Sequence, residues 1–388
     1  MAPIEAVGPG SLPGEASPDA EQSPAGVQAA VAHGVTVIRS LEELEGLGDL
    51  WDALARSGMP MQDHAWTRAA ASSFAAEGRL HIVAAGVPPD VTAIAPLAWS
   101  RGGDGCLELI GMDELGEPMD FLYADPSALA PLTDALAGFG GCLSLTRVPA
   151  ASPVIAALQR SYRGRGVVIC RPVGGYPWIP LDARWREPEG QIGSGRRSDL
   201  RRARRIAEKM GPVSAEVVSP APQQLDPLLE EAFRVEAASW KGREGTALAK
   251  DPGKAAFFRR YAAAMCTKGA LRMCFLRIGD AVAAAQIAVT FGDRFWLLKI
   301  GYDEAFARCS PGTLLSLETI RYAAVRGLRS YEFLGGPEPW TRMWTDQERP
   351  CVSLRVYPAS LRGIWVLAGA VGKIARRRLG RLFRRTPG

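Results

Sequence analysis

Histidine is scarce in this sequence: the chain has only three, His33, His64 and His81, and all of them lie in its N-terminal half. A histidine-based catalytic triad or metal site is therefore excluded from the C-terminal half. Any proton acceptor there must be a carboxylate, a tyrosine, a lysine or a bound water molecule.

Cysteine gives no sign of a covalent or metal-bound framework. The seven cysteines are an odd number, lie far apart and include no Cys-x-x-Cys pair. This spacing predicts buried, reduced thiols rather than disulfides or a zinc cluster, and we expect no metal.

The sequence also shows no pattern typical of a secretory signal or a membrane span. The opening residues lack the basic and apolar regions of a secretory signal, and no apolar run reaches the roughly 20 residues that a membrane span needs. Residues 1–34, rich in Pro, Gly, Ser and Ala, predict a disordered leader. We therefore expect a cytoplasmic protein.

Residues 359–388 predict a basic amphipathic tail, in which a short apolar stretch runs into six arginines between positions 376 and 385. Two interpretations remain open. Residues 361–385 either lie on an anionic surface, peripheral to the inner membrane, or form an untethered basic tail.

The 388 residues, 47% of them hydrophobic, predict two compact α/β units at 35–181 and 182–358. In the first, strands are expected at 35–38, 79–86, 91–99, 106–112 and 142–148, and helices at 41–58 and 128–139. In the second, strands are expected at 215–218, 271–279, 281–292, 294–303 and 330–336, and helices at 225–240, 255–269 and 313–327. The similar element order suggests a structural duplication.

A basic helix is predicted at 198–210, joining the two units. Ser198 is the expected N-cap, and Gly211 with Pro212 supplies the stop. Three interpretations of its arginines remain open: a solvated face, a contact with tRNA, or a clamp for an anionic ligand.

The second unit carries the motifs that point to chemistry. They are Glu236-Ala-Ala-Ser-Trp-Lys-Gly with Gly245-Thr246, Lys299-Ile-Gly-Tyr-Asp-Glu, Pro311-Gly312, Glu318 within a helix, and Glu332-Phe-Leu-Gly-Gly. With these motifs, residues 35–358 resemble the CelD-like group of acetyltransferases, named for cellulose biosynthesis. That group is related to the FemAB-type aminoacyltransferases and belongs to the wider GNAT superfamily.

The resemblance implies a fold of tandem GNAT-like α/β units, with mixed central sheets flanked by helices. It implies an acyltransferase that uses acetyl-CoA or another acyl-CoA as co-substrate. The acceptor would be an amine or hydroxyl of a sugar, a polysaccharide precursor or an envelope-related small molecule. Two alternatives stay open: an aminoacyltransferase that uses aminoacyl-tRNA, and a non-catalytic accessory protein of exopolysaccharide or cellulose synthesis.

Residues 294–327 predict a strand, a glycine-containing turn and a helix. The unpaired amides at such a helix end bind anions, so a coenzyme A pyrophosphate would suit it. The predicted cofactor-binding residues are Ser310, Gly312, Thr313 and Leu314; the alternative is a plain helix-starting turn.

Acyl transfer needs a base and alignment of the two substrates. Asp303 is the first candidate base, with Glu236 and Glu332 as further carboxylates, and Tyr302 could reprotonate the leaving thiolate. The alternative for each acid is a solvated or capping role.

Substrate contacts are predicted for the remaining residues of the matched motifs. These are Trp240, Lys241, Lys299, Gly335, Gly336 and Trp340. Surface charge for the lysines and core packing for the tryptophans are the alternatives. All of these assignments require one geometry: the strand that ends at Tyr302 and Asp303 must diverge from its neighbour and open a slot beside the helix after Pro311.

Overall fold

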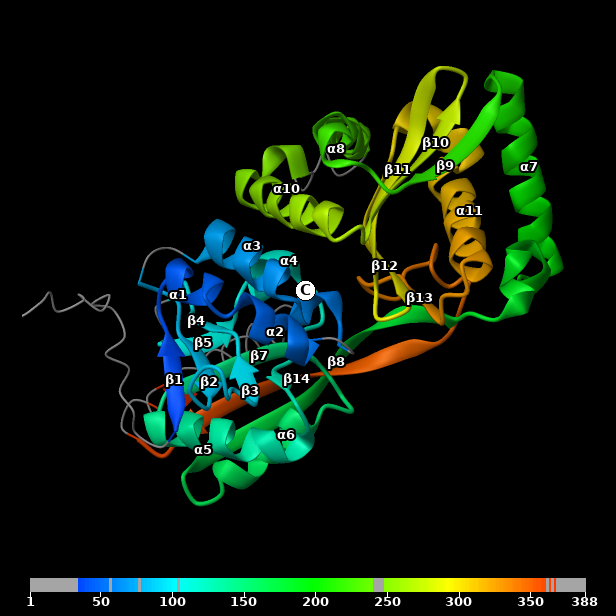
Figure 1. The fold of residues 1–388 in the computed structure, drawn as a ribbon. Helices are drawn as coiled ribbons and strands as arrows, with labels where there is room; N and C mark the ends of the chain where they lie inside the picture. The colour runs from blue at the N-terminus through cyan, green and yellow to red at the C-terminus, as the bar shows by residue number, and fades with distance from the viewer. Residues whose placement is uncertain are drawn as a thin grey trace, which may run out of the picture.

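A computed structural model describes residues 34–360 except 56–57, 76–77, 103–104 and 240–247, together with residues 363, 366 and 367. Two lobes are joined by two long strands, β8 (Gly166–Pro180) and β14 (Glu348–Pro358), which run side by side from one lobe into the other (Figure 1). The predicted fold class is confirmed, since both lobes are mixed α/β structures in which helices flank the sheets.

The first lobe is assembled from short elements. Its strands are β1 (Val35–Ile38), β2 (Ile82–Ala85), β3 (Ala93–Ala95), β4 (Leu97–Trp99), β5 (Cys106–Leu109), β6 (Leu122–Tyr123) and β7 (Cys142–Pro149); its helices are α1 (Leu41–Glu45), α2 (Gly48–Ala55), α3 (His64–Phe74), α4 (Met112–Leu115), α5 (Leu129–Phe139) and α6 (Pro153–Ser161). The single helix predicted over 41–58 is wrong. Ser40 and Glu43 form a capping box that starts α1, but Gly46 ends it, and α2 begins separately at Gly48.

The second lobe follows the predicted element order. Its strands are β9 (Val213–Val218), β10 (Leu271–Ile278), β11 (Ala281–Phe291), β12 (Arg294–Tyr302) and β13 (Ser330–Glu332); its helices are α7 (Ser194–Met210), α8 (Pro222–Ala237), α10 (Pro252–Thr267) and α11 (Pro311–Val325), with a 3₁₀ helix η6 (Glu304–Cys309) before α11. The joining helix α7 ends at Gly211 as predicted, but it begins at Ser194 rather than after Ser198. Ser198 therefore lies inside the helix, and the prediction that it is the N-cap is wrong.

The strands form two sheets. The smaller has the order β1-β2-β3-β6, and the larger has ten strands in the order β4-β5-β7-β14-β8-β13-β12-β11-β10-β9. β14 was not predicted as a strand; it pairs with both β7 and β8, so the large sheet continues from one lobe into the other. The two halves of the chain thus share hydrogen-bonded strands.

Alternating side chains of the large sheet pack on its two faces, as the pleat requires. On β10, Met273 and Phe275 point into a core shared with α8, α10 and the first lobe, whereas Cys274 and Leu276 point into a second core beneath α7 and α11. Both faces of the second lobe are therefore covered by helices (Figure 1).

Helices α3 and α10 form a second contact between the lobes. The Trp66 ring meets Phe257 and Tyr261 edge to face, and the Phe74 ring stacks on Phe257 at 5.8 Å. Such aromatic pairs add to the stability that their burial provides.

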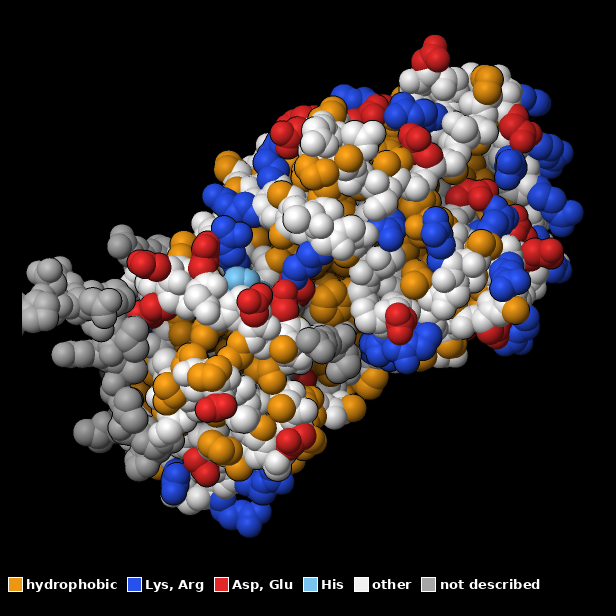
Figure 2. All heavy atoms as spheres, in the orientation of Figure 1, with side chains coloured by type: hydrophobic (Ala, Val, Ile, Leu, Met, Phe, Trp, Pro, Cys, Tyr) orange, Lys and Arg blue, Asp and Glu red, His pale blue; other side chains and the backbone are white. Residues whose placement is uncertain are grey.

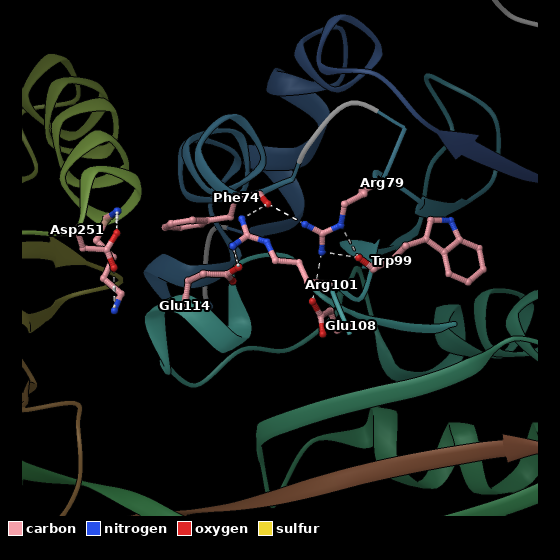
Figure 3. A network of polar contacts seen from close by, with 8 residues as sticks. Phe74, Arg79, Trp99, Arg101, Glu108, Glu114 and Asp251 are labelled. Atoms are coloured by element: carbon pink, nitrogen blue, oxygen red, sulfur yellow. Dashed lines mark hydrogen bonds and ion pairs between the residues drawn. The ribbon is translucent and has the colours of Figure 1, made fainter. Parts of the chain in front are cut away.

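Two arginines hold the end of α3 in place (Figure 3). Arg79 and Arg101 both donate to the Phe74 carbonyl oxygen, at 2.9 and 2.7 Å. This oxygen belongs to the last turn of the helix, where carbonyls lack intrahelical partners. Arg101 also pairs with Glu114 of α4 at 3.3 Å, so α4 is fixed relative to α3.

Within the described residues, no helix combines the length and the apolar character that a membrane crossing requires.

Candidate active site

The strands β12 and β13 diverge as the sequence analysis requires. They are paired in parallel only from Arg294–Ser330 to Trp296–Glu332, after which β12 continues to Tyr302. A bulge in the pairing of β12 with β11 places Leu298 as an extra residue just beyond that point. A bulge bends its strand, so β12 changes direction just where its pairing with β13 stops. The expected slot beside α11 is thus confirmed.

A cavity of about 520 Å³ occupies this slot. Its walls are the outer half of β12, the turn before α11, and the segment that follows β13. The lining residues are Leu297–Tyr302, Ala307, Ser310–Thr313, Phe333–Gly336, Ser239, Glu338, Trp340 and Glu117. This volume suits a small-molecule substrate, and the cavity opens where strands end, as sites in α/β folds commonly do.

The N-terminus of α11 closes one end of the cavity. Ser310 adopts the left-handed conformation at φ 47°, and its carbonyl accepts from the amides of Thr313 and Leu314 at 3.0 and 3.2 Å. Pro311 has no amide hydrogen, and the Gly312 amide has no acceptor in the described part of the chain. This end therefore offers an unpaired amide and the positive end of the helix dipole to an anion.

Three of the four predicted cofactor-binding residues line the cavity. These are Ser310, Gly312 and Thr313. A Cβ placed on Gly312 would meet Ile300 and Tyr302 at 3.7 and 3.8 Å, which is ordinary van der Waals contact, so Gly312 lies directly against the β12 wall of the cavity. The prediction for Leu314 is corrected, because its side chain is buried in the core beneath α7 and α11.

Of the predicted catalytic residues, only Tyr302 lines the cavity. Asp303 caps η6, where its carboxylate accepts from the Ala305 amide at 3.0 Å, and it does not belong to the cavity wall. This capping role accounts for an aspartate at position 303 without any part in catalysis. The structure therefore gives no support to Asp303 as the first candidate base.

Glu236 and Glu332 are buried on either side of the cavity rather than in it. Glu236 lies against the back of Gly301 and accepts from the Leu248 amide at 2.8 Å. The Glu332 side chain is 0% exposed and pairs with Arg349 at 2.6 and 2.8 Å. Neither carboxylate faces the slot, and both act in holding the structure together.

The predicted substrate-binding residues divide in the same way. Lys299, Gly335, Gly336 and Trp340 line the cavity. Lys299 also lies over the Phe258 ring at 5.3 Å. Trp240 and Lys241 fall outside the described residues.

Two carboxylates in the cavity wall escaped the sequence analysis. Glu338 follows the matched glycine pair and accepts from the Trp340 indole at 2.9 Å. Glu117 comes from the first lobe, in the loop between α4 and β6, and no motif around it marks it as functional. Only its position in the folded chain reveals it.

The environment of Glu117 shifts its acid strength. Burial raises the pKa of its carboxyl above the ordinary value, while the cations of Lys299 and Arg147 and a hydrogen bond from the Gly335 amide act in the opposite direction. Burial prevails, because little water reaches the group to stabilise its charge. No cluster of metal-ligating side chains occurs in the described parts of the chain.

Comparisons with known proteins agree with this geometry. Residues 194–342 match the family model described as an acetyltransferase (GNAT) domain. The fold is of the GNAT type. The matched range contains β12, α11 and the segment after β13, which together build most of the cavity. No curated protein matches the sequence.

Solved structures resemble this GNAT-type fold over most of the chain. FemX has a TM-score of 0.52 at 12% identity, covering 84% of this chain and 97% of its own. The C-terminal DUF2156 domain of a candidate lysylphosphatidylglycerol synthetase from Agrobacterium fabrum has a TM-score of 0.54 at 12% identity, covering 86% and 97%. A protein of unknown function from Bacteroides thetaiotaomicron has a TM-score of 0.51 at 10% identity, covering 82% and 98%. At these identities the likeness concerns the fold.

Proposed function

We propose that this protein is an acyltransferase that accepts an acyl group from a coenzyme A thioester bound in the slot between β12 and β13. The observation that carries the proposal is the divergence of these strands beside the N-terminus of α11. An extended thioester arm fits between the strands, while the amide of Gly312 and the helix dipole receive the pyrophosphate. The match to an acetyltransferase family over the same residues supports this donor.

The residues around the slot suit the remaining requirements of acyl transfer. Tyr302 lies in the cavity wall at the end of β12, where its hydroxyl can protonate a departing thiolate. Phe333 and Trp340 supply apolar surface that keeps water from the thioester. The acceptor enters between these walls, and the proposal so far allows an amine or a hydroxyl compound, including a sugar or a polysaccharide precursor.

Calorimetric titration with acetyl-CoA tests the proposal. We expect binding in the micromolar range. Gly312→Glu should weaken that binding by about tenfold or more, because it places a carboxylate where the pyrophosphate would lie. Val325→Glu is the matched control, since Val325 is 59% exposed on the same helix and far along it from the cavity. The proposal fails if the wild type does not bind acetyl-CoA, or if both variants bind equally well.

An aminoacyl-tRNA donor is the second candidate, and the surface of α7 favours it. Exposed arginines follow this helix at positions 196, 201, 202, 204 and 205. In Figure 2 the basic side chains gather along the edge of the second lobe where α7 lies. Such a surface attracts a polyanion. Filter binding of bulk tRNA, with α7 variants in which three of these arginines are replaced by glutamine, separates the two donors.

A further inference from the structure

Arginines gather at the end of the first lobe that points away from the second lobe. β8 begins there at Gly166, and β14 ends beside it at Pro358, which pairs with Gly166 (Figure 1). Five exposed arginines come from the last turn of α6, the turn that follows it and the two strands; we call this set, Arg160, Arg163, Arg165, Arg171 and Arg355, the basic end.

The strand register explains why these side chains are neighbours. Residues that pair directly in a sheet point to the same side, so Arg355 of β14 shares a face with Ile169 of β8. Val167 and Arg171 lie two residues to either side of Ile169 and share that face too. The Arg165 carbonyl accepts from an amide just beyond β14 at 2.7 Å, which joins the turn to the same place.

The basic end has no counter-ions of its own. None of its arginines pairs with an acid in the parts of the chain that the structure describes. Residues 148–181 have four arginines and no acid, and residues 350–388 have nine lysines and arginines and no acid. These stretches carry 13 positive charges in a chain of net charge +5, so the rest of the chain is net negative by 8. Charge is therefore segregated, and the basic end attracts anions.

Apolar side chains are exposed beside these arginines. Phe139, at the end of α5, is 48% exposed, and Val167 is 50% exposed. Phe139 lines the same groove as Arg165, together with one acid, Asp134. In Figure 2, basic and hydrophobic side chains lie together at the lower end of the first lobe. A single exposed apolar residue is ordinary, but apolar side chains among unpaired arginines are typical of a surface that meets a membrane.

The C-terminal residues extend this surface. Val366 and Leu367 pack against Tyr357, on the face of the sheet that carries Arg355. Residues 364–371 have no charged or polar side chain, and six arginines follow between positions 376 and 385. The first of these comes nine residues after Leu367, so it lies within about 30 Å of that face.

We propose that the basic end and the residues after Pro358 together dock this protein on the surface of an anionic lipid bilayer. The arginines pair with the phosphate groups of anionic lipids, while Phe139 and Val167 enter the boundary between headgroups and acyl chains. A nucleic acid would also engage the arginines, but it would gain little from an exposed valine. A lipid surface accounts for both kinds of side chain.

The docking surface is remote from the slot between β12 and β13. β8 starts at Gly166 in the basic end, and near its other end the Pro177 carbonyl accepts from the Phe333 amide, in the cavity wall, at 3.0 Å. Eleven residues of strand separate these points, which is about 35 Å. The proposal therefore does not depend on the acyltransferase function, and changes in the basic end should leave the binding of acetyl-CoA unaltered.

Co-sedimentation of the full-length protein with lipid vesicles tests the proposal. One set of vesicles holds equal parts of phosphatidylglycerol and phosphatidylcholine, and the other holds phosphatidylcholine alone. We expect binding to the anionic vesicles only. Each arginine near an anionic surface strengthens binding by about fivefold, so the triple variant Arg163→Gln, Arg165→Gln, Arg355→Gln should bind roughly 100-fold more weakly.

The matched control removes three charges from α7 instead, as Arg196→Gln, Arg201→Gln, Arg202→Gln, and should bind the vesicles as the wild type does. Should the triple variant of the basic end fail to fold, Arg165→Gln alone should still weaken binding by about fivefold.

The apolar part of the surface has its own variant. Val167→Ser should weaken binding to the anionic vesicles by about threefold, because it removes apolar area that enters the bilayer. Val325→Ser, which changes a 59% exposed valine on α11, should have no effect.

Four results would overturn the proposal. They are a wild type that does not bind the anionic vesicles, equal binding to neutral vesicles, equal binding by the two triple variants, and unchanged binding by Val167→Ser. Filter binding of bulk tRNA identifies the alternative: a wild type that binds tRNA but not vesicles, and loses tRNA in the triple variant of the basic end, assigns this surface to nucleic acid. Calorimetry with acetyl-CoA keeps the two proposals apart, since its failure would leave the vesicle result standing.

Discussion

Replacing Glu332 by glutamine should lower the stability of this protein without touching its chemistry. The carboxylate accepts two hydrogen bonds from Arg349, at 2.6 and 2.8 Å, and one from Ser330 at 2.6 Å. The guanidinium of Arg349 lies 3.8 Å above the Trp178 ring. The ion pair therefore reaches from β13 across β8 to β14 and fastens the part of the sheet that joins the lobes.

The magnitude follows from the burial of the two partners. Glutamine keeps the shape and the acceptor for Ser330 but removes the charge, so Arg349 loses its counter-ion. Breaking a buried ion pair costs roughly 3–5 kcal/mol. The Arg349 side chain is 28% exposed and can recover some hydration, which places the expected loss near the lower limit, at about 3 kcal/mol.

Urea unfolding followed by tryptophan fluorescence measures this loss, and a double variant supplies the control. In Glu332→Gln with Arg349→Met, no charge is left unpaired, and about half or more of the stability should return. A Glu332→Gln variant that is as stable as the wild type but has lost the proposed acyl transfer would refute this structural role. That result would mean that Glu332 takes part in the reaction.

Two further predictions concern steric contact and pH. Gly301→Ala should lower the free energy of unfolding by about 1–3 kcal/mol, because its methyl group would lie 2.7 Å from Cα of Glu236. Gly312→Ala is the control: its methyl group meets nothing closer than 3.7 Å, so it should unfold at the wild-type denaturant midpoint. Equal midpoints for the two variants would contradict this argument. Burial raises the pKa of Asp120 to about 7, so between pH 4 and pH 7 the folded state keeps a proton that the unfolded state releases, and stability falls as pH rises. As pH rises across this window, the free energy of unfolding of Asp120→Asn should increase by about 4 kcal/mol relative to that of the wild type. If urea unfolding gives parallel pH profiles for the two proteins, the raised pKa of Asp120 is rejected.

The second lobe could be predicted because its signals are local. The apolar patterns at β10, β11 and β12 match strands that are buried on both faces, and α10 begins just after Asp251, which caps it. The divergence of β12 from β13 was a requirement of the site assignments rather than a reading of the local pattern, and the structure meets it. For these elements, propensity and tertiary packing agree.

The two long strands that join the lobes were missed because their sequence contains strand breakers. β8 includes Pro172, Gly174, Gly175 and Pro177, which predict turns. In the fold, a Cβ on Gly175 would lie 2.4 Å from the Arg349 carbonyl oxygen, so this glycine permits the close approach of β14. The glycine has a packing role that appears only once the partner strand is in place.

Glu117 escaped prediction for a related reason. The motifs of the second unit directed attention to acids close to them in sequence, namely Asp303, Glu236 and Glu332, and each of these turns out to cap or fasten the structure. The carboxylate that faces the cavity is remote in sequence and lies in a loop without a recognisable pattern. Whether a loop of the first lobe reaches the cavity of the second depends on long-range topology, which composition and periodicity do not reveal.

The shared sheet gives that topology a consequence for the cavity. β7 holds Arg147, whose guanidinium bonds both the loop of Glu117 and the segment after β13. Because β14 pairs with β7 on one side and β8 on the other, and β8 pairs with β13, the position of the carboxylate relative to the slot is fixed through continuous hydrogen-bonded strands. A hinge motion between the lobes would change the distance between this carboxylate and the other walls of the slot. The continuous sheet opposes such a motion, so the first lobe contributes a fixed part of the cavity wall.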